Sequence, residues 1–211
     1  MTEDYKSYVC PTSGQFGYYV AGAMLFANSV TTQNIKPHHK VLDIGCGSLR
    51  VGKHFISYLD EGNYHAIEPE AKWLNEGINN ELSKNMIKQK KPRFSYSQNF
   101  EANEFNETFD FVLAFNVFIH CGPDQFKQCL INLKEHLSQE GVFIFSALIG
   151  EDPSVRYKKY RHSDGEISIF SLTQLDDLLA ECGFVRTGYI KKGKGCNNTF
   201  TASINNLPSC N

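Results

Sequence analysis

The fold is decided by the stretch Val41-Leu42-Asp43-Ile44-Gly45-Cys46-Gly47-Ser48. An apolar strand over residues 40–44 stops at a Gly-x-Gly turn, and residues 49–59 continue with the pattern of a helix. Such a turn leaves the backbone bare at the carboxyl end of a strand, where a cofactor can approach the main chain and the helix N-terminus. Taken alone, the turn also fits an ordinary strand-to-helix connection.

A carboxylate on the next strand strengthens the cofactor interpretation. Residues 63–67 form a second apolar strand that ends at Glu68, which follows Gly45 by 23 residues. The carboxyl ends of neighbouring parallel strands open onto one crevice, and a carboxylate there can accept hydrogen bonds from both hydroxyls of a ribose. The interpretation requires the turn at 45–47 and Glu68 to face the same ligand.

The rest of the chain continues the alternation of strand and helix patterns. Further strands are expected at 93–97, 109–115 and 142–145, and helices at 71–86 and 124–137. This alternation predicts a parallel sheet covered by helices on both sides. The flanking elements are a helix over 16–34, with apolar residues at 16, 20, 24 and 27, a charged and aromatic segment over 150–169, a helix from 171 to about 182, and an antiparallel hairpin over 184–190 and 199–204.

Composition excludes several classes of protein. The chain has 211 residues, a formal net charge of −2 and 41% hydrophobic residues, which fits one ordinary domain without a basic excess for binding nucleic acids. Seven cysteines without a C-x-x-C pair predict neither a zinc site nor a disulfide framework. No secretory signal or membrane-spanning run is visible. We therefore expect a reduced, soluble, cytoplasmic protein with no metal.

A nicotinamide dehydrogenase would share the glycine turn, but two patterns disfavour it. Arg50 stands where the third glycine of a dinucleotide-binding turn is expected. The short-chain dehydrogenases use Tyr-x-x-x-Lys, whereas Tyr157 is followed at that distance by Arg161 and Tyr160 by Asp164.

On these motifs the chain resembles the class I S-adenosylmethionine-dependent methyltransferases. Asp43-x-Gly45-x-Gly47 resembles the family's motif I, although Leu49 replaces its third glycine. Glu68 matches the acidic residue that closes strand two. Residues 109–117 resemble the fourth-strand motif, and 133–145 are similar to the helix, turn and strand that follow it. The resemblance covers roughly residues 38–205.

The resemblance implies a Rossmann-like three-layer α/β sandwich. Its mostly parallel seven-stranded sheet would end in a C-terminal antiparallel hairpin, and a helical extension would precede it. Residues 1–37 would form this extension or lid, and residues 38–206 the methyltransferase domain. The segment at about 150–169 would be an insertion on the substrate side.

The resemblance also implies S-adenosylmethionine as methyl donor, with S-adenosylhomocysteine as product. Gly45, Cys46 and Gly47 would line the methionine portion, and Asp43 would hold its ammonium group. Glu68 would bind the ribose, and Asn116 would lie below the sulfonium. The full expected cofactor set is Asp43, Gly45, Cys46, Gly47, Glu68, Pro69, Asn99, Phe100, Asn116 and Val117.

Two histidines are candidate general bases for methylation at a hydroxyl, since imidazole titrates near neutral pH. His120 follows the fourth strand, where it also fits a loop or helix-cap role, and His162 lies in the 150–169 segment. That segment carries Arg156, Lys158, Lys159, Arg161 and His162, which suggests an anionic acceptor but also fits a solvated basic loop. The expected substrate contacts are Tyr18, Tyr19, Tyr157 and Arg161.

These observations predict a methyltransferase acting on a small polar acceptor at oxygen, such as a sugar or another anionic metabolite. DNA is disfavoured as acceptor, because Asn116 is followed by Val-Phe-Ile rather than Pro-Pro-aromatic and the chain has no Pro-Cys pair. A protein or RNA methyltransferase and a non-catalytic cofactor-binding module stay open. No membrane partner is expected, and a homodimer stays open as well.

Overall fold

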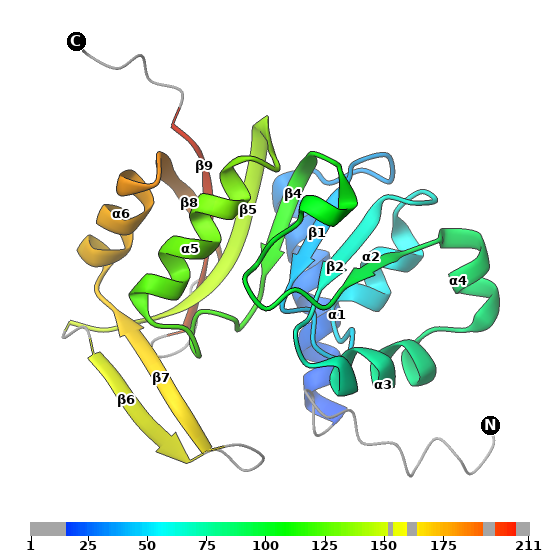
Figure 1. The fold of residues 1–211 in the computed structure, drawn as a ribbon, viewed down its shortest axis with the longest axis horizontal. Helices are drawn as coiled ribbons and strands as arrows, with labels where there is room; N and C mark the ends of the chain where they lie inside the picture. The colour runs from blue at the N-terminus through cyan, green and yellow to red at the C-terminus, as the bar shows by residue number, and fades with distance from the viewer. Residues whose placement is uncertain (1–15, 152–153, 160–163, 192–196, 206–211) are drawn as a thin grey trace. The chain divides into compact units, whose positions relative to one another are not determined.

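A computed structural model describes residues 16–151, 154–159, 164–191 and 197–205 (Figure 1). The chain divides into two compact units, Met1–Gln98 and Asn99–Asn211. Among the described residues, no helix is both long and apolar enough to cross a membrane.

The first unit contains three parallel strands in the order β3-β2-β1. Val41 pairs with Tyr64 and Asp43 with Ala66, so β1 and β2 end at the same edge. All four residues of each of these two strands are buried. The elements are α1 (Phe16–Gln33), β1 (Val41–Ile44), α2 (Gly52–Tyr58), β2 (Tyr64–Ile67), α3 (Ala71–Glu81), α4 (Lys84–Lys90) and β3 (Arg93–Ser95).

The helix predicted over 71–86 is wrong as a single element, because it is two helices. Leu82 leaves the helical conformation, and the Ser83 hydroxyl then caps α4 by accepting a hydrogen bond from the Met86 amide at 3.0 Å. A serine hydroxyl satisfies one of the free amides at a helix start, which favours a new helix at this point.

The helix predicted over 16–34 is confirmed as α1, but its apolar stripe does not face the core. Val20 and Met24 are 47% and 50% exposed, whereas Gly22 and Ser29 are buried. Phe26 packs against α2, with its ring centroid 4.9 Å from that of Phe55. Small residues on the buried face of α1 allow the helix to lie close to the rest of the first unit. The pattern of apolar residues does not reveal which face of α1 is buried. The boundary predicted between residues 37 and 38 stays a prediction.

The second unit is built around one long strand, β5. It pairs in parallel with β4 and β7 and antiparallel with β9, which in turn pairs antiparallel with β8. The elements are η2 (Asn103–Phe105), β4 (Phe109–Ala114), α5 (Pro123–Lys134), β5 (Leu137–Ile149), β6 (Ser154–Lys159), β7 (Asp164–Phe170), α6 (Leu172–Glu181), β8 (Phe184–Lys191) and β9 (Asn197–Ile204). The predicted parallel strands with a closing antiparallel hairpin are confirmed.

Residues 150–169 have more regular structure than their sequence pattern indicates. β6 and β7 pair antiparallel from Ser154↔Ile169 to Lys159↔Asp164, and β7 joins the end of β5. Figure 1 shows this hairpin extending beyond the end of β5. The described residues therefore form nine strands, where the resemblance implied seven.

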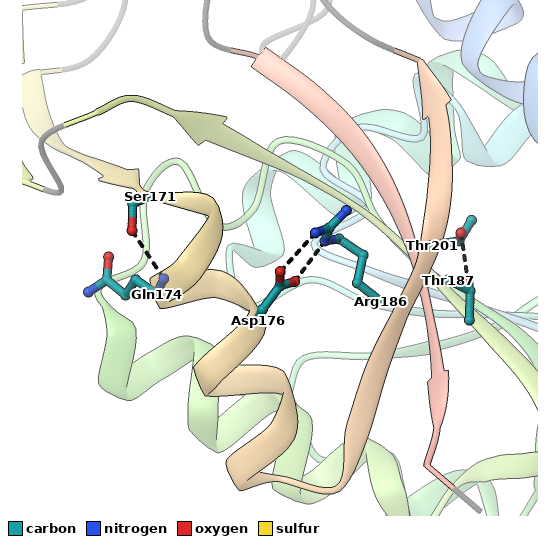
Figure 2. A network of polar contacts seen from close by, with 6 residues as sticks. All are labelled: Ser171, Gln174, Asp176, Arg186, Thr187 and Thr201. Carbon is teal, nitrogen blue, oxygen red and sulfur yellow. Dashed lines mark hydrogen bonds and ion pairs between the residues drawn. The ribbon is translucent and has the colours of Figure 1, made fainter.

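Polar contacts attach α6 to β8 at the C-terminal end of the second unit (Figure 2). The Arg186 guanidinium donates two hydrogen bonds to the Asp176 carboxylate, at 2.7 and 2.8 Å. The Ser171 hydroxyl caps α6 by accepting from the Gln174 amide at 3.0 Å. This planar, two-bond ion pair fixes the helix against the hairpin.

Candidate functional site

The turn after β1 needs its two glycines. Gly45 and Gly47 have φ angles of +64° and +56°, a left-handed conformation that costs other residues about 1–2 kcal/mol. The amides of Gly45 and Cys46 both donate to the Ile67 carbonyl, at 2.8 and 3.2 Å. These bonds connect the turn to the carboxyl end of β2.

Leu49, which stands at the family's third glycine, keeps the glycine-like conformation. Its φ is +62° although it carries a large, fully buried side chain. Its amide donates to the Cys46 carbonyl at 3.1 Å. The left-handed geometry of the turn is therefore retained without the glycine, and burial of the leucine offsets the backbone strain.

Glu68 lies directly against this turn. One carboxylate oxygen accepts from the Gly47 amide at 2.9 Å, and the other accepts from the Glu70 amide at 2.9 Å. The Glu68 amide itself donates to the Ser95 carbonyl at 3.0 Å, which connects it to β3. Burial raises the pKa of Glu68, while the two amide bonds lower it. The structure thus brings together the two features that the sequence required to face one ligand.

Asp43 is a second buried carboxylate near the turn, only 3% exposed. It accepts a hydrogen bond from the Tyr64 hydroxyl at 2.8 Å. Burial raises the pKa of Asp43 to about 7, the Tyr64 hydrogen bond lowers it, the nearby Glu68 raises it, and Arg50 lowers it. The site therefore holds two carboxylates in a desolvated environment.

Two helices pack closely against the backbone that follows the turn. A Cβ on Gly77 of α3 would lie 2.6 Å from the Ser48 carbonyl carbon. A Cβ on Gly22 of α1 would lie 2.6 Å from the Arg50 carbonyl oxygen. Both distances are too short for a side chain, so these glycines let α1 and α3 hold residues 48–50 in place.

The remaining predicted cofactor residues lie outside the glycine turn. Pro69 is exposed beside Glu68, in the first unit. Asn116 follows β4 in the second unit with φ +61°, and its amide donates to the Ser146 hydroxyl at 2.6 Å; Val117 is half-buried beside it. Phe100 also has a positive φ, +61°, and the Asn99 carbonyl accepts from the Asn132 side chain. A left-handed phenylalanine is uncommon, whereas asparagine is one of the residues that adopt this conformation most readily.

His120, the first candidate base, lies on an exposed turn of the second unit. Its amide donates to the Val117 carbonyl at 2.9 Å. The neighbouring Ile119 carbonyl accepts from the Ser168 amide of β7 at 3.0 Å, so the β6–β7 hairpin lies next to the His120 turn.

The second candidate base and the expected substrate contacts lie in three parts of the chain. Arg161 and His162 lie outside the described residues. Tyr157 is a position in β6, and Tyr18 and Tyr19 are positions in α1.

Sequence reasoning missed several residues that build these sites. Tyr64 was predicted only as part of the strand over 63–67, and Ser146 lies just after the strand predicted over 142–145. A glycine inside an amphipathic helix, such as Gly77, is the one signal that was available, because it often marks close backbone approach.

Comparisons with known proteins identify a domain and a fold. Residues 42–143 match the family model described as a methyltransferase domain. No curated protein sequence is recognisably similar to the chain. The PH0226 protein from Pyrococcus horikoshii is similar in structure, with a TM-score of 0.70 and 15% identity over 97% of this chain and 99% of that one.

Two named methyltransferases have the same fold. For magnesium protoporphyrin IX methyltransferase from Synechocystis with bound S-adenosylmethionine, the TM-score is 0.63 and the identity 15%, over 88% of this chain and 79% of that one. For the glycopeptide N-methyltransferase MtfA complexed with sinefungin, the values are 0.66 and 13%, over 87% and 94%. The Rossmann-like α/β fold class is confirmed. Residues 42–143 carry a methyltransferase domain, and the chain shares its fold with methyltransferases that were crystallised with S-adenosylmethionine.

Proposed function

We propose that the turn at residues 45–47, together with Asp43 and Glu68, binds S-adenosylmethionine. The hydrogen bond between the Gly47 amide and Glu68 carries this proposal, because it joins the glycine turn to the expected ribose carboxylate. A carboxylate has about four acceptor positions. Two amides use two of them at Glu68, which leaves positions for two ribose hydroxyls.

The other parts of the cofactor are assigned by residue type. The buried Asp43 carboxylate would hold the ammonium group, and the backbone of Gly45, Cys46 and Gly47 would line the methionine chain. Exposed Pro69 would lie beside the adenine. Asn99, Phe100, Asn116 and Val117 stay predictions from the family resemblance.

We propose a small polar acceptor methylated at oxygen, such as a sugar or another anionic metabolite. The bound sulfonium supplies an activated methyl group, so the chain has to align the acceptor, exclude water and receive a proton. His120 would take the proton, with His162 as second candidate, and Tyr18, Tyr19, Tyr157 and Arg161 would contact the acceptor. The Ser168–Ile119 contact supports this, because it places the basic β6–β7 hairpin beside the His120 turn.

A protein or RNA acceptor is the second candidate, and the basic residues of 88–93 are its best sequence support. Three of these side chains have partners in the first unit. Lys90 donates to the Leu59 carbonyl at 2.6 Å, Lys91 pairs with Glu61, and Arg93 contacts His65 at 3.5 Å. These contacts favour a structural role for the cluster and hence a small acceptor.

The test is methyl transfer from isotopically labelled S-adenosylmethionine to a cell extract separated by size. We expect label in the small-molecule fraction. Label in protein or RNA would contradict the proposed acceptor, and binding of S-adenosylhomocysteine without any transfer would indicate a non-catalytic module.

The role of His120 needs its own variant. His120→Gln should lower turnover by at least about 100-fold while leaving S-adenosylhomocysteine affinity unchanged, since general-base catalysis contributes about that factor or more. His136→Gln is the matched control, because this histidine bonds to Asn103 at 2.6 Å, away from the His120 turn in sequence. Equal turnover in the two variants would remove His120 from the mechanism.

A further inference from the structure

The Tyr64 hydroxyl donates a hydrogen bond to the Asp43 carboxyl group. The strand register explains how it gets there. Tyr64 pairs with Val41, and Asp43 lies two residues further along the same strand, so all three side chains are on one face of the sheet. The Tyr64 hydroxyl lies 2.8 Å from the Asp43 carboxyl group.

Gly52 at the start of α2 leaves the space that this contact needs. A Cβ on Gly52 would lie only 2.1 Å from the Tyr64 hydroxyl oxygen. Both residues are buried. The hydroxyl is thus confined between the helix start and Asp43, with its hydrogen directed to the carboxylate.

Three titratable or charged groups act on Asp43, and a fourth, Cys46, is affected by it. Tyr64 and Arg50 favour its charged form, Glu68 disfavours it, and the buried Cys46 thiol lies close enough to be affected by it. Burial is the largest influence and raises the pKa of Asp43 to about 7. Burial also raises the pKa of Tyr64 well above its usual value, so the tyrosine stays a hydrogen-bond donor.

We propose that Tyr64 is a positioning residue that holds the buried Asp43 carboxyl group in place for the methyl donor, and that binding of the donor releases the proton of this group. This rests on the proposed role of Asp43 as the partner of the cofactor's ammonium group. In the step, the O–H bond of the Asp43 carboxyl group breaks and the proton goes to the solvent. The ammonium group of the ligand then donates to the resulting carboxylate.

The direction of the pH dependence follows. Protonated Asp43 is neutral and cannot pair with an ammonium group, so affinity falls as the pH drops below about 7. S-Adenosylhomocysteine should bind roughly tenfold more weakly at pH 6 than at pH 8, and release about half a proton at pH 7. Tyr64→Phe removes a bond that favours the carboxylate, so its binding profile should move to higher pH.

Calorimetric titration with S-adenosylhomocysteine from pH 6 to 8.5, in buffers of different ionisation enthalpy, tests this. At pH 7, Tyr64→Phe should bind roughly 2–10-fold more weakly and release more protons than the wild type. The difference in affinity should narrow towards pH 8.5. Tyr58→Phe is the matched control, because it loses a hydroxyl bonded to the Ile35 carbonyl at 2.9 Å and should behave as the wild type.

Asp43→Asn provides a second test that does not depend on Tyr64→Phe folding. It should bind weakly, without pH dependence and without proton release. Wild-type binding that releases no proton, or a Tyr64→Phe defect of equal size at every pH, would overturn the inference while leaving the proposed function intact. No wild-type binding at any pH would overturn both.

Discussion

Glu68 and Asp176 are carboxylates that each accept two hydrogen bonds, but they serve different purposes. Glu68 is held by two backbone amides and is 5% exposed. Asp176 is held by the Arg186 guanidinium, and its side chain is 43% exposed. Neutral donors orient a carboxylate without neutralising its charge, whereas a guanidinium neutralises it. Under the proposed function, Glu68 keeps free acceptor positions for a ligand, whereas Asp176 forms a structural ion pair with Arg186.

The neighbourhood of each residue supports this distinction. Around Glu68 lie the buried Asp43 and a turn in left-handed conformation, an arrangement that costs free energy without a ligand. Around Asp176 lie a capped helix and a hairpin whose Thr187 and Thr201 hydroxyls are 2.9 Å apart (Figure 2). These contacts stabilise the fold by themselves.

The largest expected effect is the loss of ligand affinity when Glu68 is removed, with removal of Asp176 as the comparison. Glu68→Ala should weaken S-adenosylhomocysteine binding by about 1–3 kcal/mol, or roughly 5–150-fold, because charged hydrogen bonds to the ribose are lost. Asp176→Ala should leave the affinity unchanged. Calorimetric titration of both variants measures this, and equal affinities would show that Glu68 does not bind the ligand.

The second effect tests the contact that supports Asp43, in which Tyr64 lies against Gly52. Gly52→Ala should lower the free energy of unfolding by about 1–3 kcal/mol, because its Cβ has no room beside the Tyr64 hydroxyl. Gly122→Ala is the control, since a Cβ there meets nothing within 4 Å. Urea denaturation followed by circular dichroism compares them. Equal free energies of unfolding for the two variants would mean that the Tyr64 side chain moves aside without destabilising the fold.

The smallest effect concerns the ion pair between Asp176 and Arg186. Asp176→Ala should lower the free energy of unfolding by about 0.5–1 kcal/mol, because the pair is partly exposed. The difference from the wild type should shrink at 1 M salt, where such charges are screened. A loss that is independent of salt would instead indicate that this pair acts through packing of Arg186, whose guanidinium carbon lies 5.9 Å from the centroid of the Phe200 ring.

Local signals in the sequence were enough to predict the framework of the fold. The apolar strand before Gly45 and the strand that ends at Glu68 are short-range patterns, and parallel strands must end at one edge. The closing hairpin of β8 and β9 also followed from two apolar runs and a short loop. Periodicity and turn chemistry act over a few residues, so a single sequence can display them.

Other features depended on contacts between residues distant in the chain. The bond of Tyr64 to Asp43, the exposed stripe of Val20 and Met24, and the strand pairing of β6 with β7 have no local signature.

The sequence by itself thus determined the order of the elements and the position of the glycine turn, because steric limits on the backbone and hydrophobic periodicity are local. Only the tertiary structure decided that Leu49 adopts a glycine's conformation and that Asp43 loses its solvent, because burial and packing arise only when distant segments meet.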